Sequence, residues 1–402
     1  MVKITKWKPP IWLVSTIILL FLMTFFIISC KSNNNISKDS SNTNANLLKK
    51  TIELPNDLFL KGVSENKIIS VKSNSKNIYK YDYEKQELNK ETSANNPNNF
   101  IHTVICNDEW IIWEEDEGFI TEGYKPFQWQ IIGRNISSNE EIIIDKSILK
   151  NNKYDVPLFI NFYPSKLSIS ENNVLAYCKS NTDDNKNIYT ELIIYDLKTN
   201  NKKSISKTSS VWNELIQDCT IYNDQIVWSK FYNLNDDYNK RLTQYLYSDL
   251  FLFNSKTNIY QQLTSNEYYF DPYLYKDKLV AVRIPLKKPS QNACNSEIIL
   301  MNINDKKIST IVDENSACYT KIENELYRSS PKVNKQYICW YNNGFSNRYV
   351  YDYINSKFIE IYDAKSDNAD NIVNINNMFD NYIFLNINNV QSVNNKNILV
   401  VM

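Results

Sequence analysis

A polar turn followed at once by a short apolar strand recurs along this chain at intervals of about fifty residues. The apolar segments of its seven copies begin at Ile68, Trp110, Val174, Ile226, Leu279, Tyr337 and Tyr382. A repeat of this length that carries only β signals is typical of propeller blades, which must pack side by side because one blade cannot bury both faces of its sheet. We therefore predict an all-β fold, a seven-bladed β-propeller, and leave six or eight blades open.

The segments between the repeats indicate the same architecture. A third strand, rich in β-branched and aromatic residues, follows in each unit and in most units stops at Asp or Asn. No long helical period separates the strands, which excludes a parallel α/β fold. The last unit reaches Met402 without a fourth strand, and residues 47–54 are β-like. We expect this early stretch to supply the missing strand and close the ring.

The charge balance argues against one class of partner. Lys plus Arg and Asp plus Glu each number 45 among 402 residues, so the formal net charge is zero. Without a global basic field to attract nucleic acid, we predict no nucleic-acid partner. The chain has only 5 glycines, so asparagine and aspartate are expected at the left-handed backbone positions of the turns.

The first thirty residues have the pattern of a targeting segment. Lysines at positions 3, 6 and 8 precede an uncharged apolar run over residues 11–28. The run ends in Ile27-Ile28-Ser29-Cys30, which resembles the lipobox of bacterial lipoproteins. This resemblance implies that Cys30 is the lipidated residue. An uncleaved membrane anchor is the alternative, since eighteen helical residues extend about 27 Å.

Three regions follow from this pattern. Residues 1–30 are predicted to be a lipoprotein signal peptide or membrane anchor helix, and residues 31–46, rich in Ser and Asn, a flexible tether. Residues 47–402 are predicted to form the propeller. Lysines favour the inner side of a membrane, so the chain after the apolar run is expected on the outer side. Both alternatives, a lipid anchor and a helix anchor, therefore place the propeller at the extracytoplasmic face of the bacterial cell membrane.

One blade carries a pattern shared with a known family. The segments 226–229, 249–253 and 262–264 look like the blade pattern of TolB-type propellers of bacterial envelope proteins. The pairs Asp271-Pro272 and Ser330-Pro331 resemble the proline-marked start of the next blade in that family. The resemblance covers residues 57–402 loosely. It implies a propeller domain and, as a third functional hypothesis, an assembly or quality-control scaffold in the cell envelope.

The binding surface is predicted on the face that carries the connections between second and third strands. These connections are long and contain aromatic residues beside charges, which suit a protein or a polar polymer. The candidate binding residues are Glu114, Glu115, Tyr124, Phe127, Phe231, Tyr232, Tyr238, Arg241 and Arg283. The predicted partners are a protein or a cell-wall polysaccharide, together with the membrane at the N-terminus.

The chain contains few residues in patterns that carry chemistry. Its one histidine, His102, is expected to be structural, and no nucleotide-binding or nucleophile motif is present. We predict no cofactor, no metal and no catalytic residue. Paired carboxylates remain open, because Asp155, Asp218 and Asp271 fall near blade starts.

Seven cysteines are present. Cys178 and Cys339 fall in second strands and are expected to be small core residues. Cys294 and Cys318 fall in neighbouring loops of the predicted fold and are expected to form a disulfide outside the cytoplasm.

The sequence thus favours a non-catalytic binding or scaffold module. The competing hypothesis is a glycan hydrolase, which requires two carboxylates about 5–9.5 Å apart near the central channel.

Overall fold

The computed structural model contains strands and turns, and no helix, among the residues that it describes. The residues outside this description are 1–49, 65–66, 73–75, 117–128, 148–164, 184–186, 212, 233–246, 266, 286–295, 314–315, 317–327, 343–348, 362–370, 380, 390–394 and 402. The chain forms two units, Met1–Asn46 and Leu47–Met402. All strands belong to the second unit.

Four of the sheets are simple antiparallel meanders of four strands. The first holds β2 (Leu58–Ser64), β3 (Lys67–Lys72), β4 (Asn77–Asp82) and β5 (Glu87–Ser93). The second holds β6 (Phe100–Cys106), β7 (Trp110–Asp116), β8 (Trp129–Asn135) and β9 (Glu141–Lys146). The third holds β10 (Ser165–Ile169), β11 (Val174–Thr182), β12 (Ile188–Asp196) and β13 (Asn201–Lys207). The fourth holds β22 (Arg328–Val333), β23 (Tyr337–Asn342), β24 (Tyr349–Asp352) and β25 (Lys357–Glu360).

A fifth four-stranded sheet joins the two ends of the domain. It holds β26 (Asn371–Phe379), β27 (Tyr382–Asn389), β28 (Asn395–Val401) and, from the start of the domain, β1 (Lys50–Leu54). Strand β1 pairs antiparallel with β28, from Lys50 opposite Val401 to Leu54 opposite Asn397. The expectation that the early β-like stretch supplies the missing strand of the last unit is confirmed.

The remaining eight strands form one continuous sheet. They are β14 (Glu214–Tyr222), β15 (Gln225–Tyr232), β16 (Tyr247–Asn254), β17 (Ile259–Gln262), β18 (Tyr268–Tyr275), β19 (Lys278–Ile284), β20 (Glu297–Asn302) and β21 (Ile308–Val312). The two halves meet where Ser248 of β16 pairs in parallel with Tyr268 of β18. This junction forms because the short β17 pairs only with residues 251–254 of β16 and leaves Ser248 uncovered.

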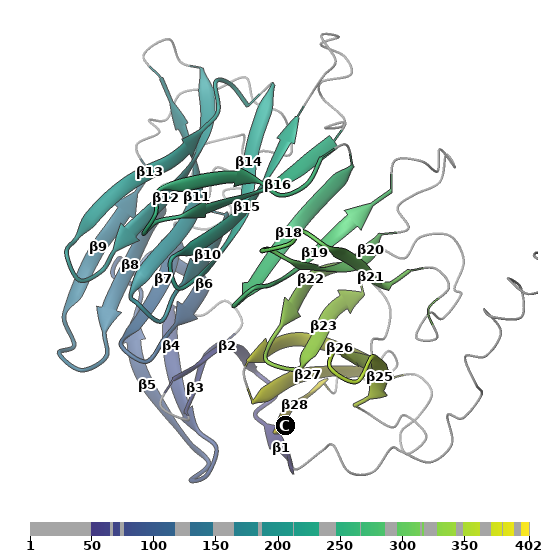
Figure 1. Cartoon of the computed structure of the whole chain (residues 1–402). Helices are drawn as coiled ribbons and strands as arrows, with labels where there is room; N and C mark the ends of the chain where they lie inside the picture. The colour runs from purple at the N-terminus through teal and green to yellow at the C-terminus, as the bar shows by residue number, and fades with distance from the viewer. Residues whose placement is uncertain are drawn as a thin grey trace, which may run out of the picture. The chain divides into compact units, whose positions relative to one another are not determined.

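The all-β propeller prediction is confirmed, but the predicted count of seven separate blades is wrong. Five blades are separate four-stranded sheets, and β14–β21 are merged into one sheet. The first strands of the meanders, β2, β6, β10, β14, β18, β22 and β26, are named the inner strands here. Each inner strand contacts the next, and β26 contacts β2, so the arrangement closes on itself. In Figure 1 the sheets surround these inner strands, with β5, β9 and β13 at the outside.

The turns are shaped by Asn and Asp, as the low glycine content predicts. Asn139, Asn173, Asn200, Asn223 and Asn258 have φ between 50° and 65°, the left-handed region. The residues that end third strands accept backbone hydrogen bonds from the turn that follows. The Asp196 carboxylate, for example, accepts the N–H groups of residues 198 and 199 at 2.9 and 3.2 Å.

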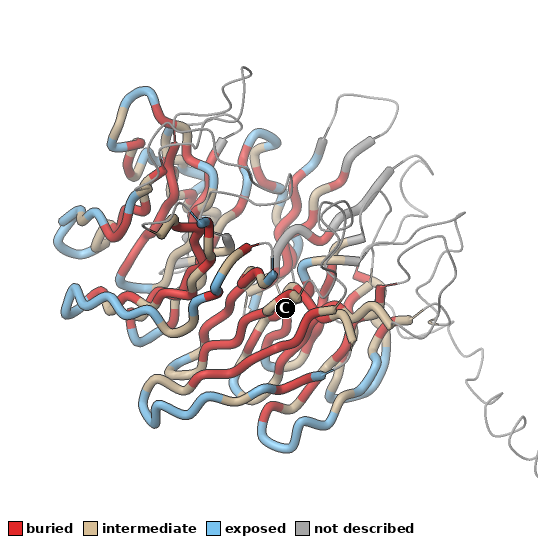
Figure 2. The backbone as a smooth tube through the Cα atoms, turned by 90° about the horizontal axis from the view of Figure 1, so that it is seen from above, coloured by how far each residue is buried: buried red, intermediate tan, exposed pale blue. Residues whose placement is uncertain are grey.

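The second strands supply much of the core. Trp113, Trp228 and Trp340 are among the largest fully buried side chains, at 0–1% exposure. Figure 2 shows buried residues along the strands and exposed residues in the connecting turns. Burial of apolar faces between neighbouring sheets holds the inner strands at fixed positions.

Candidate functional site: charged bulges on the inner strands

Every inner strand is interrupted by a β-bulge near its middle. The bulges fall at or beside Lys61, His102, Lys166, Asp218, Asp271, Ser330 and Asn376. A bulge leaves its extra residue out of the ladder and changes the direction of its side chain. Because the inner strands are neighbours around the closed arrangement, the bulges place a set of polar residues around its axis.

Four of these bulges hold a non-glycine residue in the left-handed region. The φ angles are 43° at Lys166, 51° at Asp218, 52° at Asp271 and 48° at Ser330. Such a backbone is costly for a residue with a Cβ, and residues in this conformation concentrate at functional sites. They lie on four consecutive inner strands, β10, β14, β18 and β22.

Polar contacts link these bulges to one another. Lys166 Nζ lies 3.4 Å from Asp271 Oδ1 and donates to the Pro272 carbonyl at 3.4 Å. The Ser330 backbone N–H donates to Asp271 Oδ2 at 2.9 Å. Strand β14 separates β10 from β18, so the Lys166 side chain spans one inner strand to reach its partner. The ion pair is shielded, with exposures of 28% for Lys166 and 17% for Asp271.

Asp218, on the strand between these two partners, has a perturbed acidity. Burial raises its pKa, and the negative charge of Asp271 raises it further, against the opposing effects of Lys166 and of a hydrogen bond from the Asp271 backbone. Burial alone would lower the pKa of Lys166, but the charges of Asp271 and Asp218 raise it above its ordinary value. Two carboxylates and one ammonium group therefore interact closely here.

Two further lysines approach the same place from other strands. Burial lowers the pKa of Lys332 to about 8, and the positive charges of Lys166 and Lys61 contribute to this shift. Burial also lowers the pKa of Lys61. These lysines belong to β22, β10 and β2, so positive charges of three separate sheets act on one another here. We name Lys61, Lys166, Asp218, Asp271 and Lys332 the axial cluster.

His102 belongs to the same set of bulges and has a buried acid partner. Its Nε2 lies 2.9 Å from Asp116 Oδ1, with exposures of 37% for the histidine side chain and 0% for the aspartate. The sequence assigned His102 a structural role and gave no reason to expect it on a bulge. The hydrogen bond to Asp116 fixes the orientation of the imidazole ring.

Glu114 and Glu115 were predicted in an exposed loop and instead lie in strand β7. They are 2% and 0% exposed. The Glu115 carboxylate accepts the backbone N–H groups of Asn95 and Asn96 at 2.7 and 3.0 Å and the Trp113 indole N–H at 3.0 Å. Burial and the charge of Asp116 raise the pKa of Glu114 to about 8. A run of acidic residues predicts an exposed loop. The sequence does not show the donors inside the domain, such as the Asn95 and Asn96 N–H groups, that hold Glu115 in a buried strand.

Phe231, Tyr232 and Arg283 were likewise predicted within loops, and the structure places them instead at the ends of strands β15 and β19. Phe231 is 5% exposed. Tyr232 stacks on Tyr247 with ring centroids 4.8 Å apart. The Arg283 Nε donates to Glu297 Oε2 at 2.8 Å. Each of these side chains is engaged within the domain, and a binding role for them stays a prediction.

The other predicted site residues fall outside the described residues. They are Cys30, Tyr124, Phe127, Tyr238, Arg241, Cys294 and Cys318, and also Asp155. Among the described cysteines, Cys178 and Cys339 are buried, as expected for core residues. The described part of the chain holds no group of three or more His, Cys, Asp or Glu side chains arranged for a metal ion. Within that same part, no helix has the length and apolar character needed to cross a membrane.

Comparison with known proteins supports the fold and assigns no family. No protein-family model and no curated protein sequence matches the chain. An acylaminoacyl peptidase from Pyrococcus horikoshii matches in structure with a TM-score of 0.52 and 11% identity, over 85% of this chain and 50% of that chain. This chain therefore spans half the length of that enzyme, and a likeness at this identity shows the fold alone.

Two other structural matches are weaker. The oligogalacturonate lyase from Vibrio parahaemolyticus has a TM-score of 0.47 and 10% identity, over 88% of this chain and 92% of that one. A putative TolB from Agrobacterium tumefaciens has a TM-score of 0.37 and 10% identity, over 65% and 82%. At these TM-scores neither match bears on family or activity, and the β-propeller fold is what the comparison supports.

Proposed function

We propose that the protein is a binding module, held at the extracytoplasmic face of a bacterial membrane through Cys30, that engages a polar cell-wall ligand at the axial cluster. The carrying observation is the set of charged residues on five inner strands, three of them on left-handed bulges, with an ion pair between Lys166 and Asp271. Backbone strain and buried charge both cost stability, and a fold retains them where they serve a function.

Capture of cell-wall material tests this proposal. The full chain, purified from membranes, is incubated with solubilised cell-wall and membrane fractions, and the retained material is quantified. Asp271→Asn should reduce retention strongly, because it releases Lys166 from its ion pair and rearranges the site. Asp305→Asn, in an exposed turn, is the matched control and should retain as much as wild type. Equal retention by both variants would exclude the axial cluster as the binding site.

A glycan hydrolase remains the second candidate function, and one observation favours it. The Asp271 backbone donates a hydrogen bond to Asp218, the Asp271 charge raises the pKa of Asp218, and a raised pKa is the property of a general acid. If the pair is catalytic, release of reducing ends from cell-wall glycan should be lost in both Asp218→Asn and Asp271→Asn. Binding without such release by the wild-type protein would exclude hydrolysis and leave the binding function.

A further inference from the structure

We infer that a basic surface at one end of the propeller docks on an anionic phospholipid membrane. This inference rests on the membrane location in the proposed function, because it adds a second membrane contact to the anchor at Cys30. It is carried by contacts between neighbouring turns, by the separation of exposed charges among these turns, and by the place at which the chain enters the domain.

The turns that join first to second strands lie side by side at one end of the sheets. Asn107 Nδ2, in the turn between β6 and β7, donates to Asn173 Oδ1, in the turn between β10 and β11, at 2.8 Å. The ring centroids of Tyr222 and Tyr275, at the corresponding ends of β14 and β18, are 5.2 Å apart. Because the strands of each sheet are antiparallel, the turns from third to fourth strands lie at the same end. We name this end the turn face.

Exposed charges are separated by sign across the turn face. In its described turns from β4 to β11, five acids such as Asp108 and Glu109 are exposed, and Lys85 is the one exposed lysine. In its described turns from β12 to β25, six lysines are exposed, and Asp305 is the one exposed acid. These six lysines, named the basic half here, are Lys198, Lys256, Lys276, Lys306, Lys307 and Lys335.

The contacts of the basic half leave its positive charge uncompensated. Lys306 Nζ donates to the Gln262 carbonyl at 2.8 Å, and Lys335 Nζ donates to the Asn381 side chain at 2.8 Å. Within the described part of the chain, none of the six lysines forms an ion pair with a carboxylate. The Asp196 carboxylate, which precedes Lys198, instead accepts the backbone N–H groups of its own turn. Phosphate groups outside the protein can therefore bind these lysines without displacing an internal carboxylate.

Large apolar side chains are exposed beside these lysines. Ile354, in the turn between β24 and β25, is 63% exposed, and Ile259, which follows the turn of Lys256, is 59% exposed. The next residue, Tyr260, is 50% exposed. Apolar and aromatic residues beside lysines suit the membrane interface, where apolar groups enter the headgroup region and ammonium groups meet phosphates. This composition favours a lipid surface over a purely polar partner.

The chain enters the domain at the turn face. Lys50, the first residue of β1, lies opposite Val401, and Val401 also lies opposite Tyr382, the first residue of β27. Tyr382 follows the turn between β26 and β27, and its hydroxyl group is 3.2 Å from that of Tyr83 in the turn between β4 and β5. The segment that begins at Cys30 therefore joins the domain from the face that carries the basic half. Stable membrane attachment commonly combines an anchor with a basic patch.

Lysine acylation of the full chain in nanodiscs tests this inference. One copy per disc is reconstituted in phosphatidylcholine with or without phosphatidylglycerol, and acylation of each lysine is quantified by mass spectrometry. The acylation rates of Lys256, Lys306 and Lys307 should fall at least about threefold when the anionic lipid is present. They should recover at about 1 M salt, where the Debye length is about 3 Å. Lys146, exposed at the opposite end of β9, is the internal control and should react equally in both lipids.

Substitutions within the turn face add a second readout. Replacing three lysines together, by Lys256→Gln, Lys306→Gln and Lys307→Gln, should remove the protection that phosphatidylglycerol gives to Lys198 and Lys276. Lys85→Gln is the matched control, because Lys85 is also an exposed turn lysine but lies among the acids. This variant should keep the protection of the wild-type protein.

The outcomes separate this inference from the proposed function. Equal acylation with and without phosphatidylglycerol, in a chain retained by the discs, would overturn docking and leave the anchor standing. A chain that is not retained by the discs would refute the membrane location itself. Protection that requires two copies per disc, whatever the lipid, would assign the basic half to the acidic turns of a second copy and would also overturn the inference.

Discussion

Single residues at the axis reduce the stability of the fold that holds them. The raised pKa of Asp218, to about 7, means that the folded protein disfavours the charged carboxylate. The folded state therefore binds the proton more tightly than the unfolded state, in which an aspartate has a pKa of about 3.9. By linkage, this residue makes the protein progressively less stable as the pH rises from about 4 to 7.

Asp218→Asn should consequently stabilise the protein at pH 8. The amide is uncharged, and its oxygen can still accept the hydrogen bond from the Asp271 backbone. We expect a higher melting temperature than wild type at pH 8 and no gain at pH 5, where Asp218 is already protonated. Asp305→Asn should leave the melting temperature unchanged at both pH values. A lower melting temperature for Asp218→Asn at pH 8 would contradict the assignment of Asp218 as a disfavoured charge.

At this scale the sequence predicted residue types better than their conformations. It placed Asp218 and Asp271 near the starts of blades, where they lie. It gave no sign that Lys166 and Asp218 occupy the left-handed region, because neither is followed by proline and neither is a glycine. The Asp-Pro and Ser-Pro pairs at 271 and 330 were the available signals for the bulges.

Contacts between sheets hold the elements together, and one of them is a buried charge network. Asp145 of β9 accepts hydrogen bonds from Tyr177 and Lys179 of β11, at 2.7 and 2.8 Å, and from Lys202 of β13 at 3.1 Å. Burial alone would raise the pKa of Asp145, but these donors lower it below the ordinary value. The network therefore stabilises the protein at neutral pH and is lost as the pH falls through that lowered pKa.

Asp145→Asn should cost about 3–5 kcal/mol of unfolding free energy, because Lys179 is left as a buried charge without its carboxylate. Lys179 is only 7% exposed. Denaturant midpoints at pH 7 measure this loss, with Asp305→Asn as the surface control. A change smaller than about 0.5 kcal/mol, the range of ordinary surface substitutions, would contradict a structural role for the network.

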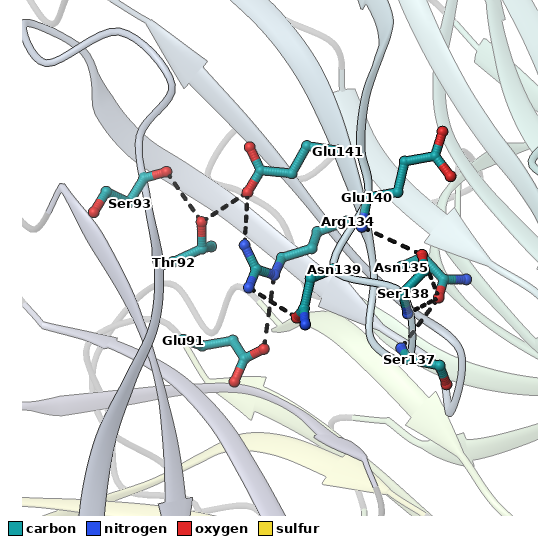
Figure 3. Close-up of polar contacts among 10 residues, drawn as sticks. All are labelled: Glu91, Thr92, Ser93, Arg134, Asn135, Ser137, Ser138, Asn139, Glu140 and Glu141. Atoms are coloured by element: carbon teal, nitrogen blue, oxygen red, sulfur yellow. Dashed lines mark hydrogen bonds and ion pairs between the residues drawn. The ribbon is translucent and has the colours of Figure 1, made fainter.

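A second contact between sheets lies nearer the solvent. Arg134 of β8 donates to Glu141 at 3.0 Å and Asn139 at 2.9 Å and approaches Glu91 of β5 at 3.8 Å, while Thr92 donates to the same Glu141 oxygen at 3.0 Å (Figure 3). Exposed ion pairs contribute little. We expect Arg134→Ala to cost about 1 kcal/mol or less at low salt, measured by denaturant midpoint, and less still at high salt. A larger, salt-independent loss would show that packing of the arginine stem dominates.

The elements themselves were predictable where their signal is local. Turn residues and apolar second strands follow from hydrogen bonding and alternation within a few residues, so the repeat was visible in the sequence. The merged sheet was not, because it depends on the length of β17 and on a single pairing between Ser248 and Tyr268. The burial of Glu115 in β7 was not predictable either, because its hydrogen-bond donors belong to Asn95, Asn96 and Gln130, which are distant in sequence.

The whole molecule depends on joining its two ends. Strand β1 completes the sheet of β28. The side chain of Asn397, which is only 3% exposed to solvent, stabilises this junction. Its Nδ2 donates to the carbonyls of Pro55 and Leu58 at 3.0 and 2.8 Å, and its Oδ1 accepts from Asn386 at 2.8 Å. One side chain thus ties the last strand to the segment between the first two.

Asn397→Ala and removal of residues 44–55 should destabilise the domain to different extents. The substitution removes the buried amide that donates to the carbonyls of Pro55 and Leu58, a loss of about 1–3 kcal/mol. The deletion removes β1 entirely and exposes the edge of β28, so it should lower the melting temperature further and promote association through that edge. Asn304→Ala, in an exposed turn, is the control. Because the inner strands contact one another in a closed series, loosening this junction should weaken every interface together and preserve one cooperative transition. A deletion variant that melts at the wild-type temperature would show that the ring is held closed by contacts of β26 with β2 alone.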